Sequence, residues 1–114
     1  MNLTIVNITE GDLEEFCSIL QEAASWLRNS GREMWKLEQL TSNHILNTYS
    51  LGELYLAYID GSSASAIVLQ EEDAIFWPNE KNNSLFIHKL SIRRKFAKTG
   101  LSEEMISWAK SQAW

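Results

Sequence analysis

Apolar residues in this chain of 114 residues follow two spacings, one of two positions and one of three to four. Runs that alternate or are rich in β-branched residues predict strands at 2–8, 53–59, 65–70 and 85–92. Helical spacing predicts one helix between Thr9 and Gly31, a second from Thr41 or Ser42 to near Gly52, and a third from Gly100 to Trp114. The predicted order is β-α-α-β-β-β-α, in one α/β domain over residues 1–114.

The strand at 53–59 indicates a sheet that is covered on both sides. Leu54, Leu56 and Tyr58 fall on one face of this strand, and the alternate positions Tyr55, Ala57 and Ile59 are apolar as well. Asp60-Gly61 is a strong hairpin signal and joins this strand to the next. We therefore expect helices on both faces of a central sheet.

A basic loop connects the last predicted strand to the last predicted helix. Residues 89–98 hold half of the chain's 10 Lys and Arg residues and no acid, although the formal net charge is −5: they are Lys89, Arg93, Arg94, Lys95 and Lys98. The N–H groups and the dipole at a helix N-terminus favour anions such as phosphate. One basic loop on an acidic protein favours a particular anion over nucleic acid.

Composition narrows the class of protein further. The one cysteine, Cys17, excludes an intramolecular disulfide, is expected to be buried on the first helix, and fits a reducing cytoplasm. The only histidines, His44 and His88, do not form a ligand-spaced pair, so we expect no metal site, and His44 is expected at the surface. There is no charged-then-apolar leader and no apolar run near the ~20 residues of a membrane span, so we expect a cytoplasmic protein.

The element order and the loop resemble the GNAT superfamily of acyl-CoA N-acyltransferases. In that family a hydrophobic strand is followed by a loop of the form (Gln/Arg)-x-x-Gly-x-(Gly/Ala), and Ala97, Gly100 and Ser102 stand at its three defined positions without a gap. Further similar stretches bring the resemblance to nearly all of residues 3–112: Trp26-Leu27-Arg28, Gly31, Trp35, Leu40-Thr41, Leu54-Tyr55-Leu56-Ala57, Asp60-Gly61 and Leu69-Gln70. The resemblance implies a mixed central sheet with flanking helices.

The resemblance also implies that acetyl-CoA is the cosubstrate. The backbone of the strand end would pair with the pantetheine arm, and the loop amides from about Lys98 to Ser102 would hold the pyrophosphate. The expected coenzyme A-binding residues are Leu90, Ser91, Ile92, Lys95, Ala97, Lys98, Thr99, Gly100, Leu101 and Ser102. Basic side chains nearby are expected to supply positive charge: Arg93, Arg94, Lys95 and Lys98.

The chain departs from the family pattern in the motif and in its length. Ala97 replaces Gln or Arg and Ser102 replaces Gly or Ala, but phosphate binding by backbone amides can survive both changes. A full family member continues with a parallel strand and a helix, so the resemblance implies a C-terminally truncated domain. The strand ending at Ile92 would then have an exposed edge, which strand exchange in a homodimer is one way to cover.

The family reaction is direct attack of a primary amine, on a small molecule or peptide, on the acetyl-CoA thioester. It needs a general base, for which His88 is a candidate because an imidazole can accept a proton and because this residue is expected on the same strand face as Leu90. Glu72, with Glu71 and Asp73, is the rival, and this acidic rim would suit a cationic amine. The competing interpretation of His88 is a histidine packed in the sheet, and that of residues 71–73 is a solvated acidic turn.

Other functions stay open on the sequence. Ala97 and the short C-terminus favour a degenerate, non-catalytic acyl-CoA-binding or protein-interaction domain, whereas overall acidity argues against a nucleic-acid-binding module. Trp26 and Trp35 bracket the turn after the first helix. Either both pin the connection between two helices, or one of them provides a wall of a substrate pocket.

Overall fold

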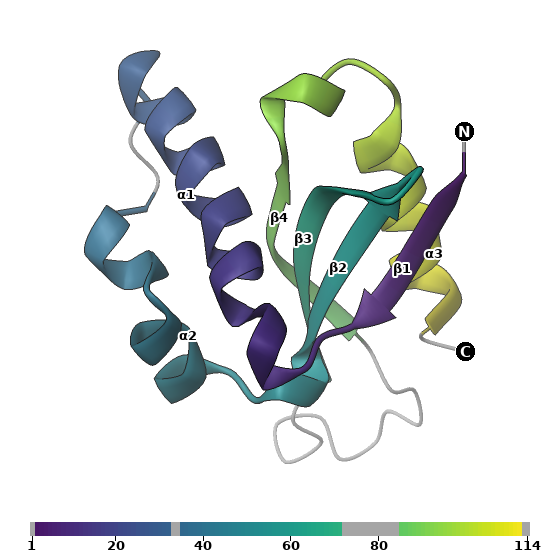
Figure 1. The fold of residues 1–114 in the computed structure, drawn as a ribbon, viewed down its shortest axis with the longest axis horizontal. Coiled ribbons are helices and arrows are strands. Elements are labelled where there is room, and N and C mark those ends of the chain that lie inside the picture. Colours follow the sequence, from purple (N-terminus) through teal and green to yellow (C-terminus); the bar gives the residue numbers. More distant parts are fainter. Residues whose placement is uncertain (1, 33–34, 72–84, 113–114) are drawn as a thin grey trace, which may run out of the picture.

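The computed structural model describes residues 2–32, 35–71 and 85–112. Four strands form one sheet in chain order, and three helices flank it (Figure 1): β1 (Leu3–Asn7), α1 (Leu13–Asn29), α2 (Ser42–Thr48), β2 (Leu54–Ile59), β3 (Ser62–Glu71), β4 (Leu85–Ile92) and α3 (Leu101–Gln112). The predicted order β-α-α-β-β-β-α is confirmed. Short helical turns are added at Glu10–Asp12, Leu37–Leu40, Leu51–Glu53 and Arg94–Phe96.

The sheet is antiparallel at every pairing between the described strands. We expected a mixed sheet, with parallel as well as antiparallel pairs. Within the described residues no strand has a parallel partner, because the four strands pair in chain order. Asp60 and Gly61, with φ of 50° and 86°, form the two-residue turn between β2 and β3. Positive φ at both positions is what a tight hairpin of this twist requires.

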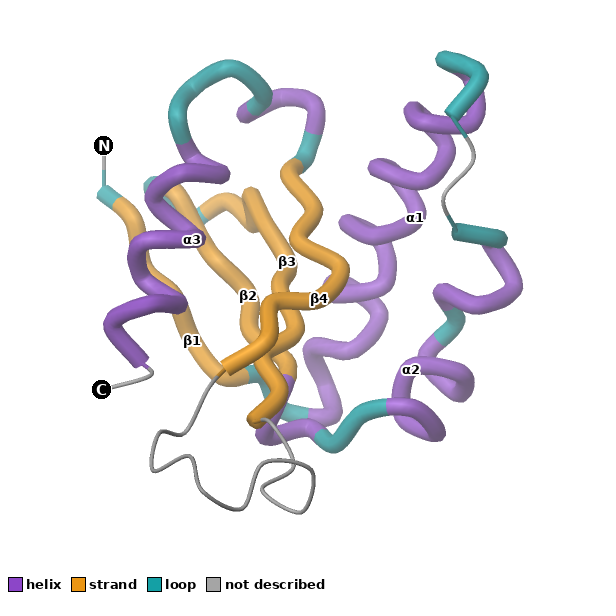
Figure 2. Tube along the Cα trace, turned by 180° about the vertical axis from the view of Figure 1, so that it is seen from behind, coloured by secondary structure: helices purple, strands orange, loops and turns teal. Residues whose placement is uncertain are grey.

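Two apolar layers cover the two faces of the sheet, as the two-sided pattern of β2 predicts. Leu54 and Leu56 are buried with residues of α1 and α2, whereas Ala57 and Ile59 are buried with α3. Figures 1 and 2 show α1 and α2 on one side of the sheet and α3 on the other. This arrangement leaves β4 as an outer strand of the sheet, with α1 beside one of its faces.

Local signals account for most of the helix ends. The Thr9 backbone N–H and hydroxyl donate to the Asp12 carboxylate at 2.9 and 3.0 Å, which closes the turn before α1. The Thr41 hydroxyl accepts from the His44 backbone N–H at 3.2 Å and caps α2. That helix ends earlier than predicted, because Tyr49 is extended with φ of −129°.

The serine and alanine tract after Gly61 is part of β3, which begins three residues earlier than predicted. Ser62 is exposed and Ser63 half-buried, whereas Ala64, Ser65 and Ala66 are buried. The last residues of the third predicted helix, 113–114, lie outside the described residues. Among the described residues, no helix is long and apolar enough to cross a membrane.

Candidate acyl-CoA site

β4 carries a bulge in its second half, directly before the basic loop. Lys89 has a φ of 51°, and the pairing with β3 jumps from His88 opposite Val68 to Ser91 opposite Ala66. Lys89 and Leu90 therefore stand against one residue of β3. An extra residue of this kind bends a strand and changes the face to which the following side chains point.

The bulge corrects the expected placement of His88. The His88 ring lies beside Tyr49, with 6.5 Å between ring centroids, on the face covered by α1 and α2. Leu90 packs with the cluster on the α3 side. The prediction that His88 and Leu90 share a strand face is wrong, because the extra residue shifts the alternation by one position. His88 instead shares its face with Ser91.

The connection from β4 to α3 has the shape of an anion-binding turn. Lys98 and Gly100 both have positive φ, 63° and 82°, and the Thr99 hydroxyl donates to the Phe96 carbonyl at 2.6 Å. α3 begins at the next residue, Leu101, and the first N–H groups of an α-helix have no acceptor within the helix. The turn thus brings free backbone donors and the positive end of a helix dipole to one place.

The predicted coenzyme A-binding residues lie together along the end of β4 and this turn. Lys95, Lys98, Thr99, Gly100 and Ser102 are exposed, and Ala97 is half-buried. Leu101 is 1% exposed in the α3-side core, so only its backbone is available to a ligand. On β4, Leu90 and Ile92 are half-buried and Ser91 is buried. The Ser91 carbonyl accepts from the Ser65 hydroxyl at 2.8 Å.

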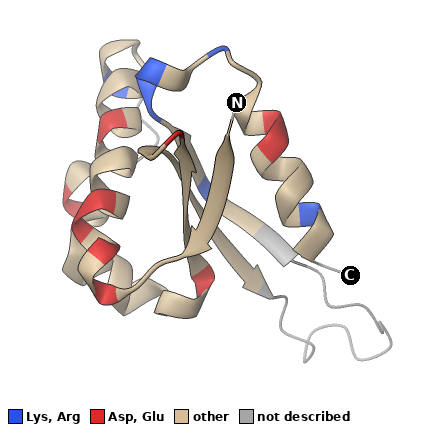
Figure 3. Cartoon of the chain, turned by 45° about the vertical axis from the view of Figure 1, so that its right-hand side comes forward, with Lys and Arg blue, Asp and Glu red and all other residues tan. Residues whose placement is uncertain are grey.

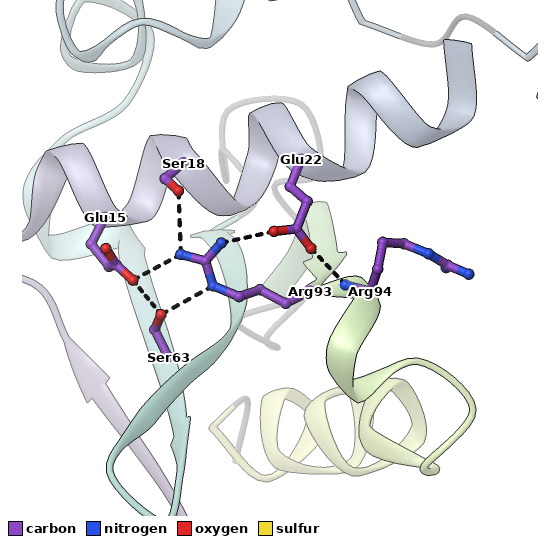
Figure 4. Close-up of polar contacts among 6 residues, drawn as sticks. All are labelled: Glu15, Ser18, Glu22, Ser63, Arg93 and Arg94. Carbon is purple, nitrogen blue, oxygen red and sulfur yellow. Dashed lines mark hydrogen bonds and ion pairs between the residues drawn. The ribbon is translucent and has the colours of Figure 1, made fainter. Parts of the chain in front are cut away.

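Arg93 does not belong to the exposed charge of the loop, which corrects our expectation. Its guanidinium donates to Glu22 at 3.0 Å, to Glu15 at 2.8 Å and to Ser18 at 3.2 Å (Figure 4). Its Nε donates to the Ser63 hydroxyl at 3.1 Å, and its side chain is 18% exposed. Arg93 therefore ties the strand end to α1 and is not available to a phosphate.

The acidic residues of this network were not among the predicted site residues. Glu15, Ser18 and Glu22 recur at helical spacing on one side of α1, and this polar stripe is the signal that could have found them. The hydroxyl of Ser63 donates to the Glu15 carboxylate. That bond, followed by the one from Arg93, lowers the pKa of Glu15. Figure 3 shows the contrast between acidic positions along α1 and basic positions in the β4–α3 connection.

Two other basic residues make cation–π contacts with tryptophan rings. The Arg94 guanidinium lies over the Trp26 ring, 3.8 Å from its centroid, and the Lys89 ammonium lies 4.9 Å from the centroid of Trp35. Burial lowers the pKa of the Lys89 ammonium. Arg94 is nevertheless exposed, so the described loop presents three exposed basic residues: Arg94, Lys95 and Lys98. Of these, Lys95 and Lys98 do not lie over a tryptophan ring.

A cavity of about 360 Å³ lies between α1 and β4, beside the bulge. Trp26 and Trp35 both line it, together with Lys89 and Arg94. Trp35 also packs against the core, so it pins the helix connection and borders a cavity at once. The helix-connection interpretation is therefore confirmed for Trp35, whereas Trp26 is 40% exposed. A role of either tryptophan as the wall of a substrate pocket stays a prediction.

The remaining candidates are placed as follows. His44 is exposed and Cys17 is 3% exposed, as predicted, and burial raises the pKa of the Cys17 thiol. Glu72 and Asp73 lie outside the described residues. Within the described part of the chain, no three His, Cys, Asp or Glu residues come together as a group that could hold a metal ion.

Comparison with known proteins bears on the fold of the chain. No protein-family model matches the chain. A curated relative, the uncharacterized N-acetyltransferase YesJ of Bacillus subtilis, is 26% identical over 88% of this chain. The chain spans 59% of that relative's length.

Two solved structures of acetyltransferases are similar in fold to this chain. A GNAT-family acetyltransferase from Listeria monocytogenes matches with a TM-score of 0.74 and 20% identity, over 96% of this chain and 69% of its own. The PaiA N-acetyltransferase from Thermoplasma acidophilum, in complex with coenzyme A, matches with a TM-score of 0.72 and 14% identity, over 99% and 72%. The chain therefore has the GNAT acyl-CoA N-acyltransferase fold, as its sequence resemblance predicts.

Proposed function

We propose that this chain binds acetyl-CoA and transfers its acetyl group to a primary amine of a small molecule or peptide. The observation that carries the proposal is the turn from β4 into α3, where Lys98 and Gly100 have positive φ and the helix N-terminus follows at once. Backbone donors of this kind bind a phosphate without help from side chains. The turn therefore fits the pyrophosphate of coenzyme A even with Ala97 and Ser102 in the motif.

The chain's own groups have separable tasks in this proposal. The loop amides from Lys98 to Ser102 hold the pyrophosphate, and the exposed ammonium groups of Lys95 and Lys98 add positive charge. The backbone of Leu90, Ser91 and Ile92 lies on an outer strand and can pair with the amides of the pantetheine arm. Bound acetyl-CoA supplies the activated acetyl thioester.

His88 is our candidate for the general base. It lies one residue before the bulge, on the side of the sheet where the cavity borders α1. An imidazole titrates near neutral pH and can accept the proton that the attacking amine must lose. Glu72 is the second candidate for this role.

The test is a transfer assay with acetyl-CoA and a set of primary amines. The proposal predicts free coenzyme A thiol and N-acetylated amine in equal amounts, the first measured with a thiol reagent and the second by mass spectrometry. Acetyl-CoA binding without transfer to any amine would instead support the alternative, a non-catalytic acyl-CoA-binding or interaction domain. Ala97 in place of the family's Gln or Arg is the feature that favours this alternative.

We also propose that a second copy covers the outer edge of β4. In the described sheet β4 pairs only with β3, and an exposed strand edge is a template for further pairing. Sedimentation velocity at several protein concentrations tests this proposal. A dimer that weakens when proline replaces Ile87 is expected, and a monomer at every concentration would contradict it.

A further inference from the structure

The cavity between α1 and β4 is small and largely apolar, with basic groups at its walls. Its volume of about 360 Å³ is near the lower end of the ~300–1,000 Å³ that ligand pockets usually have. Ala23 and Leu27 from α1 contribute aliphatic surface, and Leu90 borders the cavity from β4. Such a site suits an occupant about as large as one amino acid.

The aromatic walls of the cavity are already in contact with cations. The Lys89 ammonium lies 4.9 Å from the Trp35 ring centroid, and the Arg94 guanidinium lies 3.8 Å from that of Trp26. A cation–π site for an incoming ammonium group would need one of these ring faces to be free. A polycationic amine would also meet two like charges at short range.

Neither of these cations has an acidic partner among the described residues. The nearby carboxylates of Glu15 and Glu22 bind the guanidinium of Arg93 at 2.8 and 3.0 Å. Lys89 is half-buried, and this burial without a compensating acid lowers its pKa. Placing a carboxylate beside the ammonium would offset that desolvation cost.

We infer that this cavity binds the amine acceptor through a carboxylate held by Lys89 and Arg94, with an apolar body against Trp26 and Trp35. The acceptor class is then an amino-carboxylate with an apolar side group rather than a polyamine. That the bound molecule is the acetyl acceptor rests on the proposed function. The preference of the cavity for a carboxylate does not. It also differs from the cationic amine that the acidic segment near Glu72 suggests.

Matched ligands test the charge preference directly. Calorimetry in buffer free of acetate and phosphate compares valine, leucine, isoleucine, methionine and phenylalanine with their amides and with putrescine. We expect at least one free amino acid to bind ten or more times tighter than its amide and than putrescine. The inference is overturned if no amino acid binds, or if the amides or putrescine bind as tightly.

Variants at Lys89 test whether this residue causes the preference for a free carboxylate. Lys89→Met should remove at least tenfold of the preference for the free amino acid over its amide, and Lys89→Arg should retain most of it. Lys110→Met, at an exposed position of α3, is the matched control and should change nothing. An unchanged preference in Lys89→Met, with its thermal stability intact, would overturn the inference.

A titration with acetyl-CoA on the same samples separates the two proposals. If acetyl-CoA binds and no carboxylate preference is found, only the inference about the acceptor fails. If acetyl-CoA does not bind, the proposed function fails, and the amino acid titrations still decide whether the cavity selects an anion.

Discussion

Glu22 of α1 accepts a hydrogen bond from the guanidinium of Arg93 at 3.0 Å, although the two residues are 71 positions apart in the chain (Figure 4). The other carboxylate oxygen of Glu22 accepts the backbone N–H of Arg94 at 2.6 Å. The Glu22 carboxylate thus binds both the side chain of Arg93 and the backbone N–H of Arg94. The position of the loop relative to α1 depends on this pair.

Replacing Arg93 by methionine should weaken acetyl-CoA binding and lower stability. The change removes an ion-paired group that is 18% exposed and leaves two carboxylates without their partner. Because both acids are partly solvated, we expect a loss of about 1–3 kcal/mol in the free energy of unfolding. Urea denaturation measures it, with Arg32→Met at an exposed position as control. Equal stability of the two variants would contradict the role given to Arg93.

Gly100→Ala should be costly although there is room for the added methyl group. Beyond the two chain neighbours, no atom would lie within 4 Å of a Cβ at this position, so the cost comes from the φ of 82°. An L-residue with such a φ lowers the free energy of unfolding by roughly 1–2 kcal/mol. If the turn changes conformation to avoid this cost, the loop amides are displaced. Gly52→Ala, which has equal space and no positive φ, is the control. Thermal unfolding and acetyl-CoA titration should distinguish the two variants, and similar behaviour of both would contradict the argument.

The pKa of Glu15 predicts how acid affects stability. Hydrogen bonds from Ser63 and then Arg93 lower this pKa from its ordinary value of 4.5. The stabilisation is therefore fully present above pH 4.5, and it is lost as the pH falls from there through the lowered pKa of the folded protein. Comparing melting temperatures of the wild type and Glu15→Gln between neutral and acidic pH measures this. The difference should shrink on acidification, and a difference that stays constant would contradict the assignment.

The histidines offer a matched test of the general base. His88→Gln should lower kcat of acetyl transfer by roughly 10²–10⁴-fold near neutral pH, with acetyl-CoA affinity retained. His44→Gln, at an exposed position, should leave kcat unchanged. Equal rates in the two variants would assign the base to another group, with Glu72→Gln as the next variant.

The thiol of Cys17 should react slowly in the folded protein. It is 3% exposed, the Ser42 hydroxyl lies 4.0 Å from its sulfur, and burial raises its pKa. A chromogenic thiol reagent should therefore label it many times faster in denaturant than in buffer. Fast labelling of the folded protein would contradict its burial and would add a background to the transfer assay.

Features set by local sequence were predictable in this chain. The two-sided alternation of β2, the Asp60-Gly61 turn and the Thr41 cap are confirmed, because each depends on residues close together in the chain. The resemblance of the loop to the GNAT motif likewise identified the fold. What stays untested is the role of each loop residue toward a ligand.

Features that depend on distant contacts were not predictable. A lysine with a φ of 51° carries no sequence signal, so the bulge at Lys89 was missed and His88 was assigned to the same strand face as Leu90. Arg93 could not be separated from its basic neighbours either. Its inward position depends on carboxylates of α1 that are more than 70 positions away.

The central claim is that the turn from β4 into α3 holds the pyrophosphate of coenzyme A. The most direct test is calorimetry with acetyl-CoA on the wild type, on Lys95→Glu/Lys98→Glu, and on Lys36→Glu/Lys110→Glu, which reverses two exposed charges elsewhere. We expect the wild type and the control to bind, and the loop variant to bind about tenfold or more weakly, since each reversal places a like charge near the phosphates. No binding by the folded wild type, or equal binding by all three proteins, would contradict it.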